Sequence, residues 1–231
     1  MRNLSKGFTL IEIAIVLVII GLLLGGVLKG QELITGARVR NLISQQDGIK
    51  AAFFGFQDRY RALPGDYAAA STNIAGVTIT GDGNGRIEAP NAAGTHEEIL
   101  VWNHLTAAGF LNGSYTMANS SVSSPAPTNN PVNPYSVYLT LVYDNAYGSG
   151  TVPSKHNLKT GSQVPVEIMA EVDRKIDDGQ PYTGGFQFST YVPPSAGFTA
   201  PVATGTGGCI TASSTWDITT GSTNCGAASL F

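Results

Sequence analysis

The sequence predicts an α+β protein in which one long N-terminal α-helix packs on a small antiparallel β-sheet. A long apolar segment near the N-terminus runs into an amphipathic helical pattern, which predicts the helix. Short stretches of alternating apolar and polar residues in the second half of the chain predict the strands. The 28 glycines and 12 prolines indicate many turns between these short elements.

The segment from Phe8 to Leu28 contains one charged residue, Glu12. About 20 apolar residues in a helix cover ~30 Å, which is enough to cross the hydrocarbon core of a bilayer. A carboxylate at membrane depth costs roughly 2.5–3.5 kcal/mol even on mild insertion scales. We therefore expect a specific role for Glu12. A plain membrane anchor that tolerates an acid near its end is the alternative.

The stretch Gly7-Phe8-Thr9-Leu10-Ile11-Glu12, preceded by Lys6, resembles the processing site of type IV pilins and of the pseudopilins of type II secretion. In that family a membrane peptidase cuts after the glycine and the new N-terminal residue is methylated. The resemblance implies cleavage between Gly7 and Phe8, methylation of the Phe8 amine and a role for Glu12 in assembly. It covers residues 1–30 closely and the remainder of the chain in layout.

The resemblance also implies a pilin-like domain order. A leader would occupy residues 1–7, a transmembrane or filament-core helix residues 8–30, its amphipathic continuation residues 31–63 and a globular head residues 64–231. The implied partners are other pilin subunits, a prepilin peptidase and methyltransferase, and an assembly platform in the inner membrane. The head would lie outside the cytoplasm before the subunit joins a periplasmic or surface filament.

Cleavage would give Glu12 a partner of opposite charge. The new ammonium at Phe8 lies about 6 Å along the helix axis from Glu12. In apolar surroundings each charge is costly alone, and a pair neutralises both. If the amine of one subunit meets Glu12 of its neighbour, the ion pair fixes the axial offset between parallel helices, which is the best attested use of buried ion pairs.

The helix is expected to continue from Phe8 to about Ala62, because apolar residues recur at helical spacing until Pro64-Gly65-Asp66 predicts a turn. Gly21 with Gly25, and Gly26 with Gly30, form small-xxx-small spacings that allow close helix approach. Many pilins have a proline near this position, where this chain has glycines. The apolar stripe consists of Val39, Leu42, Ile49, Phe53, Phe56, Tyr60 and Leu63.

The chain has two cysteines, Cys209 and Cys225. An even number of cysteines in a translocated chain favours a disulfide, and two free thiols are the alternative. Many type IV pilins close a C-terminal loop with such a bridge, so the resemblance also favours a disulfide loop here.

The stretch Thr80–Glu88 is similar to the first part of a calcium-binding loop. Thr80 stands where the usual first acid is expected, and position twelve is Asn91 rather than Glu. A Gly/Asn turn without an ion is the alternative interpretation. The candidate ligands are Asp82, Asn84, the backbone carbonyl of Arg86, and Glu88.

In the head, Thr95-His96-Glu97-Glu98 predicts a capping box that begins a helix, and Gly109 predicts its end. A second helix is predicted at Val166–Asp177, between Pro165 and Gly179. The acids Asp173, Asp177 and Asp178 cluster there. Metal binding is one interpretation of this cluster, and a solvated helix face is the simpler one. A surface loop is predicted at Asn112–Pro134, and strands are predicted at Tyr135–Tyr143, near Phe186–Val192 and within Ser213–Thr220.

No recognisable catalytic constellation is present, so the sequence predicts a structural protein that enzymes process. The net charge of −3 gives no signature of polyanion binding. We expect no nucleic-acid partner and no cofactor apart from possible calcium. The basic residues of the long helix lack an interleaved aromatic platform and are interpreted as a solvated face: Arg38, Arg40, Lys50, Arg59 and Arg61.

The sequence leaves three alternatives to a building subunit of a pilus. The first is a type II secretion pseudopilin, which would form a short piston. The second is a minor pilin at the filament tip that acts as an adhesin or captures DNA. The third is a membrane-anchored domain that never assembles.

Overall fold

The structure is a computed structural model that describes residues 9–194 and 197–231. The predicted leader and the predicted methylation site, Gly7 and Phe8 among them, lie outside the described residues. The fold divides into two compact units, Met1–Arg38 and Val39–Phe231. The domain boundaries predicted at residues 30 and 63 remain predictions.

Helix α1, Leu10–Tyr60, contributes to both units. Its first part is apolar on all sides, and among the described residues it is the one helix long and apolar enough to cross a membrane. The helix ends at Tyr60 because Arg61 takes a left-handed conformation with φ of 52°. Pro64 follows, so the predicted long helix is confirmed and ends close to the predicted residue.

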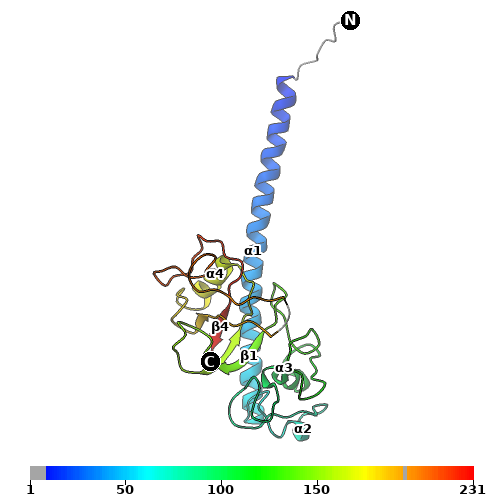
Figure 1. Cartoon of the computed structure of the whole chain (residues 1–231). Helices are drawn as coiled ribbons and strands as arrows, with labels where there is room; N and C mark the ends of the chain where they lie inside the picture. The colour runs from blue at the N-terminus through cyan, green and yellow to red at the C-terminus, as the bar shows by residue number, and fades with distance from the viewer. Residues whose placement is uncertain (1–8, 195–196) are drawn as a thin grey trace. The chain divides into compact units, whose positions relative to one another are not determined.

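The second unit contains a four-stranded antiparallel sheet (Figure 1). Its spatial order is β1-β2-β4-β3, so the last strand of the chain lies between two earlier ones. This placement gives the C-terminal segment two hydrogen-bonded neighbours. The strands are β1, Thr140–Asp144; β2, Lys155–Lys159; β3, Phe186–Phe188; and β4, Ala227–Leu230.

The predicted apolar stripe of α1 forms the centre of the head, from Val39 onward. Val39 and Leu42 pack in one cluster with α4, β3 and the two cysteines. Ile49 and Phe53 belong to a second cluster with α3 and the strands β1 and β2. The helix therefore packs on the sheet through the face that its sequence period predicted.

Three shorter helices complete the head: α2, Ala70–Asn73; α3, Glu97–Ala107; and α4, Val166–Ile176. Pro165 precedes α4 as predicted. The predicted capping box of α3 is wrong, because its N-cap is His96 and no side chain caps the helix. Glu97 and Glu98 are instead buried. Gly109 ends α3 as predicted, with φ of 80°.

The strand predictions were only partly right. Residues Tyr135–Leu139 do not join β1, because Asn133 Oδ1 accepts the amides of Tyr135 and Val137 and Ser136 has φ of 62°. The stretch Ser213–Thr220 is no strand and forms only an isolated bridge, Ile210 with Trp216. Strands β2 and β4 were not predicted. The loop 112–134 contains no helix or strand, as expected.

Candidate functional site

The first described residues form a reciprocal cap at the start of α1. The backbone amide and the hydroxyl of Thr9 donate hydrogen bonds to Glu12 Oε2 at 2.8 and 2.7 Å. The Glu12 amide donates in return to Thr9 Oγ1 at 3.3 Å. This is a capping box, which satisfies amides that have no partner within the helix. The Thr9-x-x-Glu12 spacing carries that signal in the sequence, and the sequence analysis missed it.

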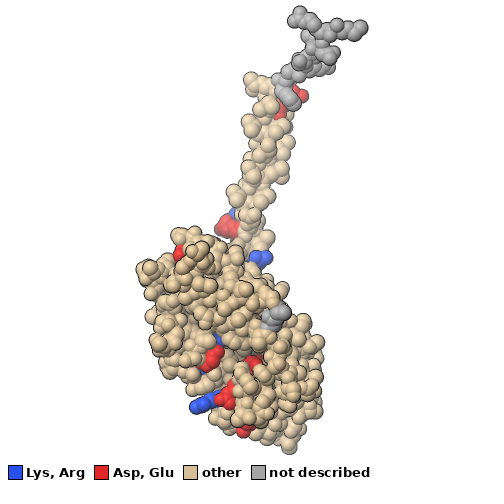
Figure 2. Space-filling model, viewed as in Figure 1, with Lys and Arg blue, Asp and Glu red and all other residues tan. Residues whose placement is uncertain are grey.

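The surface of α1 that follows the cap is apolar and uncovered. The side chains from Thr9 to Lys29 are all exposed in the single chain, and Leu10 and Leu22 are 89% and 73% exposed. Figure 2 shows an almost unbroken uncharged surface along this part of the helix. Apolar patches of this extent mark sites that bind membrane or other protein. The segment therefore requires lipid or other helices around it.

The four glycines of this segment, Gly21, Gly25, Gly26 and Gly30, pack against no side chain or backbone among the described residues outside the helix itself. A Cβ atom added at any of them would meet nothing within 4 Å. Glycine in a helix costs about 1 kcal/mol relative to alanine. An intramolecular contact does not explain that cost, whereas close approach of a second helix does. Lys29 and Glu32 form an exposed ion pair at 2.7 Å at the end of the uncharged run.

The predicted disulfide is confirmed between Cys209 and Cys225. Both cysteines are fully buried. The backbone of Cys225 forms an isolated β-bridge with Val164, just before α4. Trp216 lies inside the loop that the disulfide closes, and its indole Nε1 donates to Asp173 Oδ2 of α4 at 2.6 Å. The disulfide therefore closes the C-terminal loop at its base, and the Trp216–Asp173 hydrogen bond fastens the loop to α4.

The structure brings the predicted calcium ligands together on an exposed turn. The Asn84 amide nitrogen Nδ2 donates to Asp82 Oδ2 at 3.2 Å and to Glu88 Oε2 at 2.9 Å. Asn84 Oδ1 accepts the backbone amide of Arg86 at 2.8 Å. Asn84 therefore links the carboxylates of Asp82 and Glu88 through hydrogen bonds. Calcium at this turn remains a prediction.

Two buried acids that the sequence analysis did not connect with this turn hold it from behind. Asp66 accepts the amides of Gly83 and Asn84 through Oδ1, at 2.7 and 3.0 Å, and that of Gly85 through Oδ2 at 2.8 Å. Burial raises the pKa of Asp66, and these amides oppose the rise. Asp66 is distant from the turn in sequence, so no local pattern indicates the contact.

Glu97 holds the other side of the turn. Its Oε1 accepts the Asp82 amide at 3.1 Å and Asn91 Nδ2 at 2.8 Å, and its Oε2 accepts the Glu88 amide at 3.1 Å. Burial raises the pKa of Glu97 to about 7, against these hydrogen bonds. Carboxylate oxygens of Asp66, Asp82 and Glu97 lie within 4.8 Å of one another. Every carboxylate oxygen of Asp66 and Glu97 accepts a hydrogen bond, so the two acids hold the turn in place.

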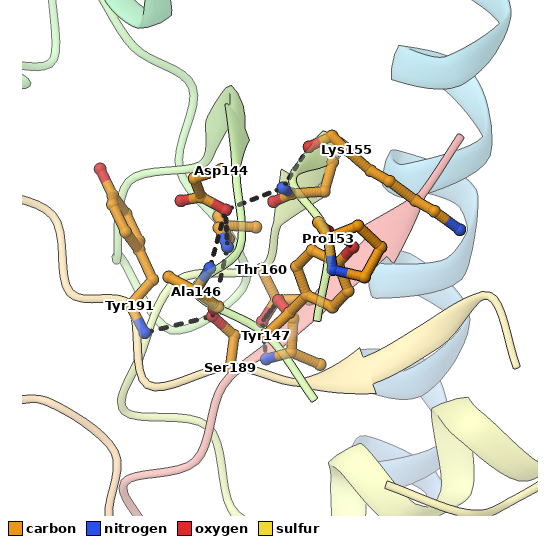
Figure 3. A network of polar contacts seen from close by, with 11 residues as sticks. Asp144, Ala146, Tyr147, Pro153, Lys155, Thr160, Ser189 and Tyr191 are labelled. Carbon is orange, nitrogen blue, oxygen red and sulfur yellow. Dashed lines mark hydrogen bonds and ion pairs between the residues drawn. The ribbon is translucent and has the colours of Figure 1, made fainter. Parts of the chain in front are cut away.

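A buried ion pair lies on one face of the sheet. Lys159 Nζ donates to Asp144 Oδ1 at 2.8 Å and to the Ala146 carbonyl at 3.0 Å, and its side chain is 1% exposed. The rings of Tyr147 and Tyr191 face the ammonium at 5.7 and 5.5 Å. Figure 3 shows the two tyrosines on opposite sides of Asp144 and Ala146. Burial lowers the pKa of Lys159, and the charge of Asp144 opposes that shift. The pair ties β2 to the end of β1.

In a comparison with protein families, residues 2–28 match the family described as "Prokaryotic N-terminal methylation motif". This chain carries a prokaryotic N-terminal methylation motif. The methylation motif is the signature of type IV pilins and pseudopilins, which confirms the family resemblance of the N-terminal segment. No curated protein and no solved structure matches the chain. The methylation motif contains Gly7, Phe8 and Glu12, and their individual roles remain predictions.

Proposed function

We propose that this protein is a structural subunit of a type IV pilus or a pilus-like filament. It is made as a membrane-anchored prepilin, cut after Gly7, methylated at Phe8 and assembled through the first part of α1. One observation carries the proposal: the methylation motif at residues 2–28 includes the apolar first part of α1, whose side chains from Thr9 to Leu28 are all exposed.

The exposed apolar helix explains why the subunit polymerises. In the membrane, lipid surrounds the side chains from Leu10 to Leu28. Outside the membrane these side chains would face water, at a cost of roughly 25 cal/mol for each Å² of apolar surface. A fibre core of parallel helices covers them again, so the segment can leave the bilayer only as part of an assembly. The glycines allow those helices to approach closely.

The proposed register pairing is compatible with the helix cap. Both hydrogen bonds from Thr9 use Glu12 Oε2. Among the described residues Oε1 is the oxygen left to receive the Phe8 ammonium of a neighbouring subunit. The cap orients the carboxylate, and the neighbour's amine then fixes the axial offset.

A Glu12→Ala variant tests the proposal in cells. Membrane insertion should remain normal, because the change makes the segment more apolar. Incorporation into sheared surface fibres should fall sharply, because the charge partner is lost. Fibres of normal amount and composition from this variant would count against the assembly role.

A type II secretion pseudopilin is the second candidate, because the methylation motif is shared by pilins and pseudopilins. Deletion of the gene separates the two roles. Loss of surface fibres with normal export of secreted enzymes supports a pilin, and the reverse supports a pseudopilin. If the protein is a scarce component of otherwise normal fibres, it acts as a minor pilin at the tip.

A further inference from the structure

Three aspartates meet at the C-terminal end of α4. Asp173 lies in the last turns of the helix, and Asp177 and Asp178 follow its end. One carboxylate oxygen from each lies within 4.8 Å of the other two. Asp173 is buried, Asp177 is half-buried and Asp178 is exposed. The cluster therefore extends from the interior of the head to solvent.

The buried member of the cluster is incompletely satisfied. Asp173 is 0% exposed, and its Oδ2 accepts the Trp216 indole at 2.6 Å. Its Oδ1 is also buried and has no hydrogen-bond partner among the described residues. The Gly179 amide opposes part of the rise in the pKa of Asp173. An unsatisfied buried polar atom costs about 1–3 kcal/mol, and more if it is charged.

Among the described residues no side-chain cation forms an ion pair with the cluster. Arg174 and Lys175 lie beside it in sequence, but both pair with Glu171, at 2.7 and 3.0 Å. Lys50 is too far from Asp177 to form an ion pair, although its charge still interacts with that of Asp177. Burial, together with the two neighbouring aspartates, raises the pKa of Asp173 to about 6.

The loop after α4 holds the outer two carboxylates in place. Asp177 Oδ2 accepts the Phe186 amide at 2.7 Å, and Asp178 Oδ1 accepts the Gln180 amide at 2.9 Å. Asp178 Oδ2 also accepts the Thr183 hydroxyl. Gly184 has φ of 73°, and a Cβ there would lie 2.1 Å from Asp177 Oδ2. The backbone thus passes directly over the Asp177 carboxylate, where only glycine fits.

We propose that Asp173, Asp177 and Asp178 bind a calcium ion. The donors are all carboxylate oxygens, which suit hard cations and not zinc or copper. Calcium accepts irregular coordination by 6–8 oxygens, so water can supply the remaining ligands on the exposed side, whereas magnesium demands a near-ideal octahedron. The ion would satisfy Asp173 Oδ1 and offset three negative charges at once.

The ion would join three parts of the head: α4, the loop leading to β3, and the disulfide loop through the Trp216–Asp173 bond. The site differs from the group of Asp66, Asp82 and Glu97, in which the buried oxygens already have donors. The inference concerns the head alone and stands whether or not the chain assembles into a filament.

Terbium luminescence tests the proposal, because Tb³⁺ replaces Ca²⁺ and is sensitised by a nearby tryptophan. The full-length chain in detergent micelles should show saturable Tb³⁺ emission on tryptophan excitation. Emission should disappear in Trp216→Phe and persist in Trp102→Phe, since Trp102 lies on α3 with Glu97. Ca²⁺ should displace Tb³⁺ with an apparent Kd on the order of 10⁻⁴–10⁻³ M, as in extracellular calcium modules.

Asp178→Asn is the ligand variant, because Asp178 is exposed and its replacement leaves the core intact. It should weaken Ca²⁺ competition at least about tenfold, as loss of even an outer partner of a metal does. Glu171→Gln is the matched control on the same helix and should leave Ca²⁺ competition unchanged. Four results would overturn the proposal. Two concern the emission itself: its absence, or its loss in Trp102→Phe. The other two concern competition: failure of Ca²⁺ to displace Tb³⁺, or Ca²⁺ competition that Asp178→Asn leaves unchanged.

The effect of Ca²⁺ on thermal stability is a second test, which does not depend on tryptophan emission. Saturating Ca²⁺ should raise the Tm of the wild-type chain, because a ligand that binds only the folded state stabilises it. Asp173→Asn should remove this increase while its circular dichroism spectrum stays native. An equal Ca²⁺-induced increase in that variant would also overturn the proposal.

Discussion

Thr9 and Glu12 cap each other at the start of α1: two donors of Thr9 reach Glu12 Oε2, and the Glu12 amide reaches Thr9 Oγ1. The acid in the apolar segment therefore has a role within a single subunit. A cap explains a polar side chain at this position, but a neutral glutamine would cap as well. The negative charge itself still requires a partner outside the helix.

Two variants separate the cap from the charge. Glu12→Gln keeps an acceptor for Thr9 and removes the charge, and Thr9→Val removes the hydroxyl and keeps the charge. We expect Glu12→Gln to be nearly absent from sheared fibres and Thr9→Val to be incorporated with a modest loss, since a helix cap contributes about 1 kcal/mol. Immunoblots of fibre and membrane fractions measure both. Equal incorporation of the two variants would refute the register role.

The Lys159–Asp144 pair predicts unequal effects of removing either partner. Asp144→Asn leaves the buried Lys159 ammonium without its counter-charge and should cost about 3 kcal/mol of unfolding free energy. Lys159→Met should cost less, because Asp144 is 24% exposed and keeps the amides of Ala146 and Asn157 as donors. Urea unfolding measures both. The exposed Lys155 on the same strand, changed to methionine, is the control and should have little effect.

His104 predicts a loss of stability in acid. Its Nδ1 accepts the Gly65 amide at 3.0 Å and its Nε2 faces the Ile79 carbonyl at 3.1 Å, an arrangement that suits the neutral ring. Burial lowers the pKa of His104 to about 4, below the value of 6.5 expected in the unfolded chain. The neutral ring therefore stabilises the fold above pH 6.5, and that contribution is lost as the pH falls towards 4.

His104→Gln isolates this effect, because glutamine can accept from Gly65 and donate to Ile79 without titrating. Between pH 6.5 and 4 the Tm of the wild-type chain should fall more steeply than that of the variant. Parallel Tm curves over this range would show that protonation of His104 does not contribute to the acid loss.

The disulfide predicts a local loss of order. Replacing both Cys209 and Cys225 by serine should cost roughly 3 kcal/mol, the loop-closure contribution for about 15 residues. The Trp216 indole should lose its fixed contact with Asp173, because the loop around it is no longer closed. Near-ultraviolet circular dichroism and chemical denaturation measure these effects. A native tryptophan signal in the double variant would contradict this account of the loop.

The sequence predicted correctly the elements that depend on residues close together in the chain. The long apolar run and the stripe of α1 follow from residue spacing alone, and Pro165 marks the start of α4 directly. The cysteine pair was predictable because an even count leaves few options. The Thr9-x-x-Glu12 spacing also carries the signal of a capping box, which the sequence analysis did not include.

The missed features depend on partners far apart in the sequence. Strand β4 is short and becomes a strand only between β2 and β3, so its own residues carry little signal. Asp66 folds a turn that lies well beyond it in the chain, and Glu97 points inward although its sequence suggested a cap. Strands β1 and β2 pair with Thr140 opposite Lys159, and the long Lys159 side chain reaches Asp144 at the other end of β1. Neither strand's sequence indicates this contact.

Mass spectrometry of the mature N-terminus, on protein from sheared surface fibres, tests the central claim most directly. The account predicts a chain that begins at Phe8 with a methylated amine. A mature protein that still begins at Met1 would contradict it, because Glu12 would then have no new ammonium to pair with on a neighbouring subunit.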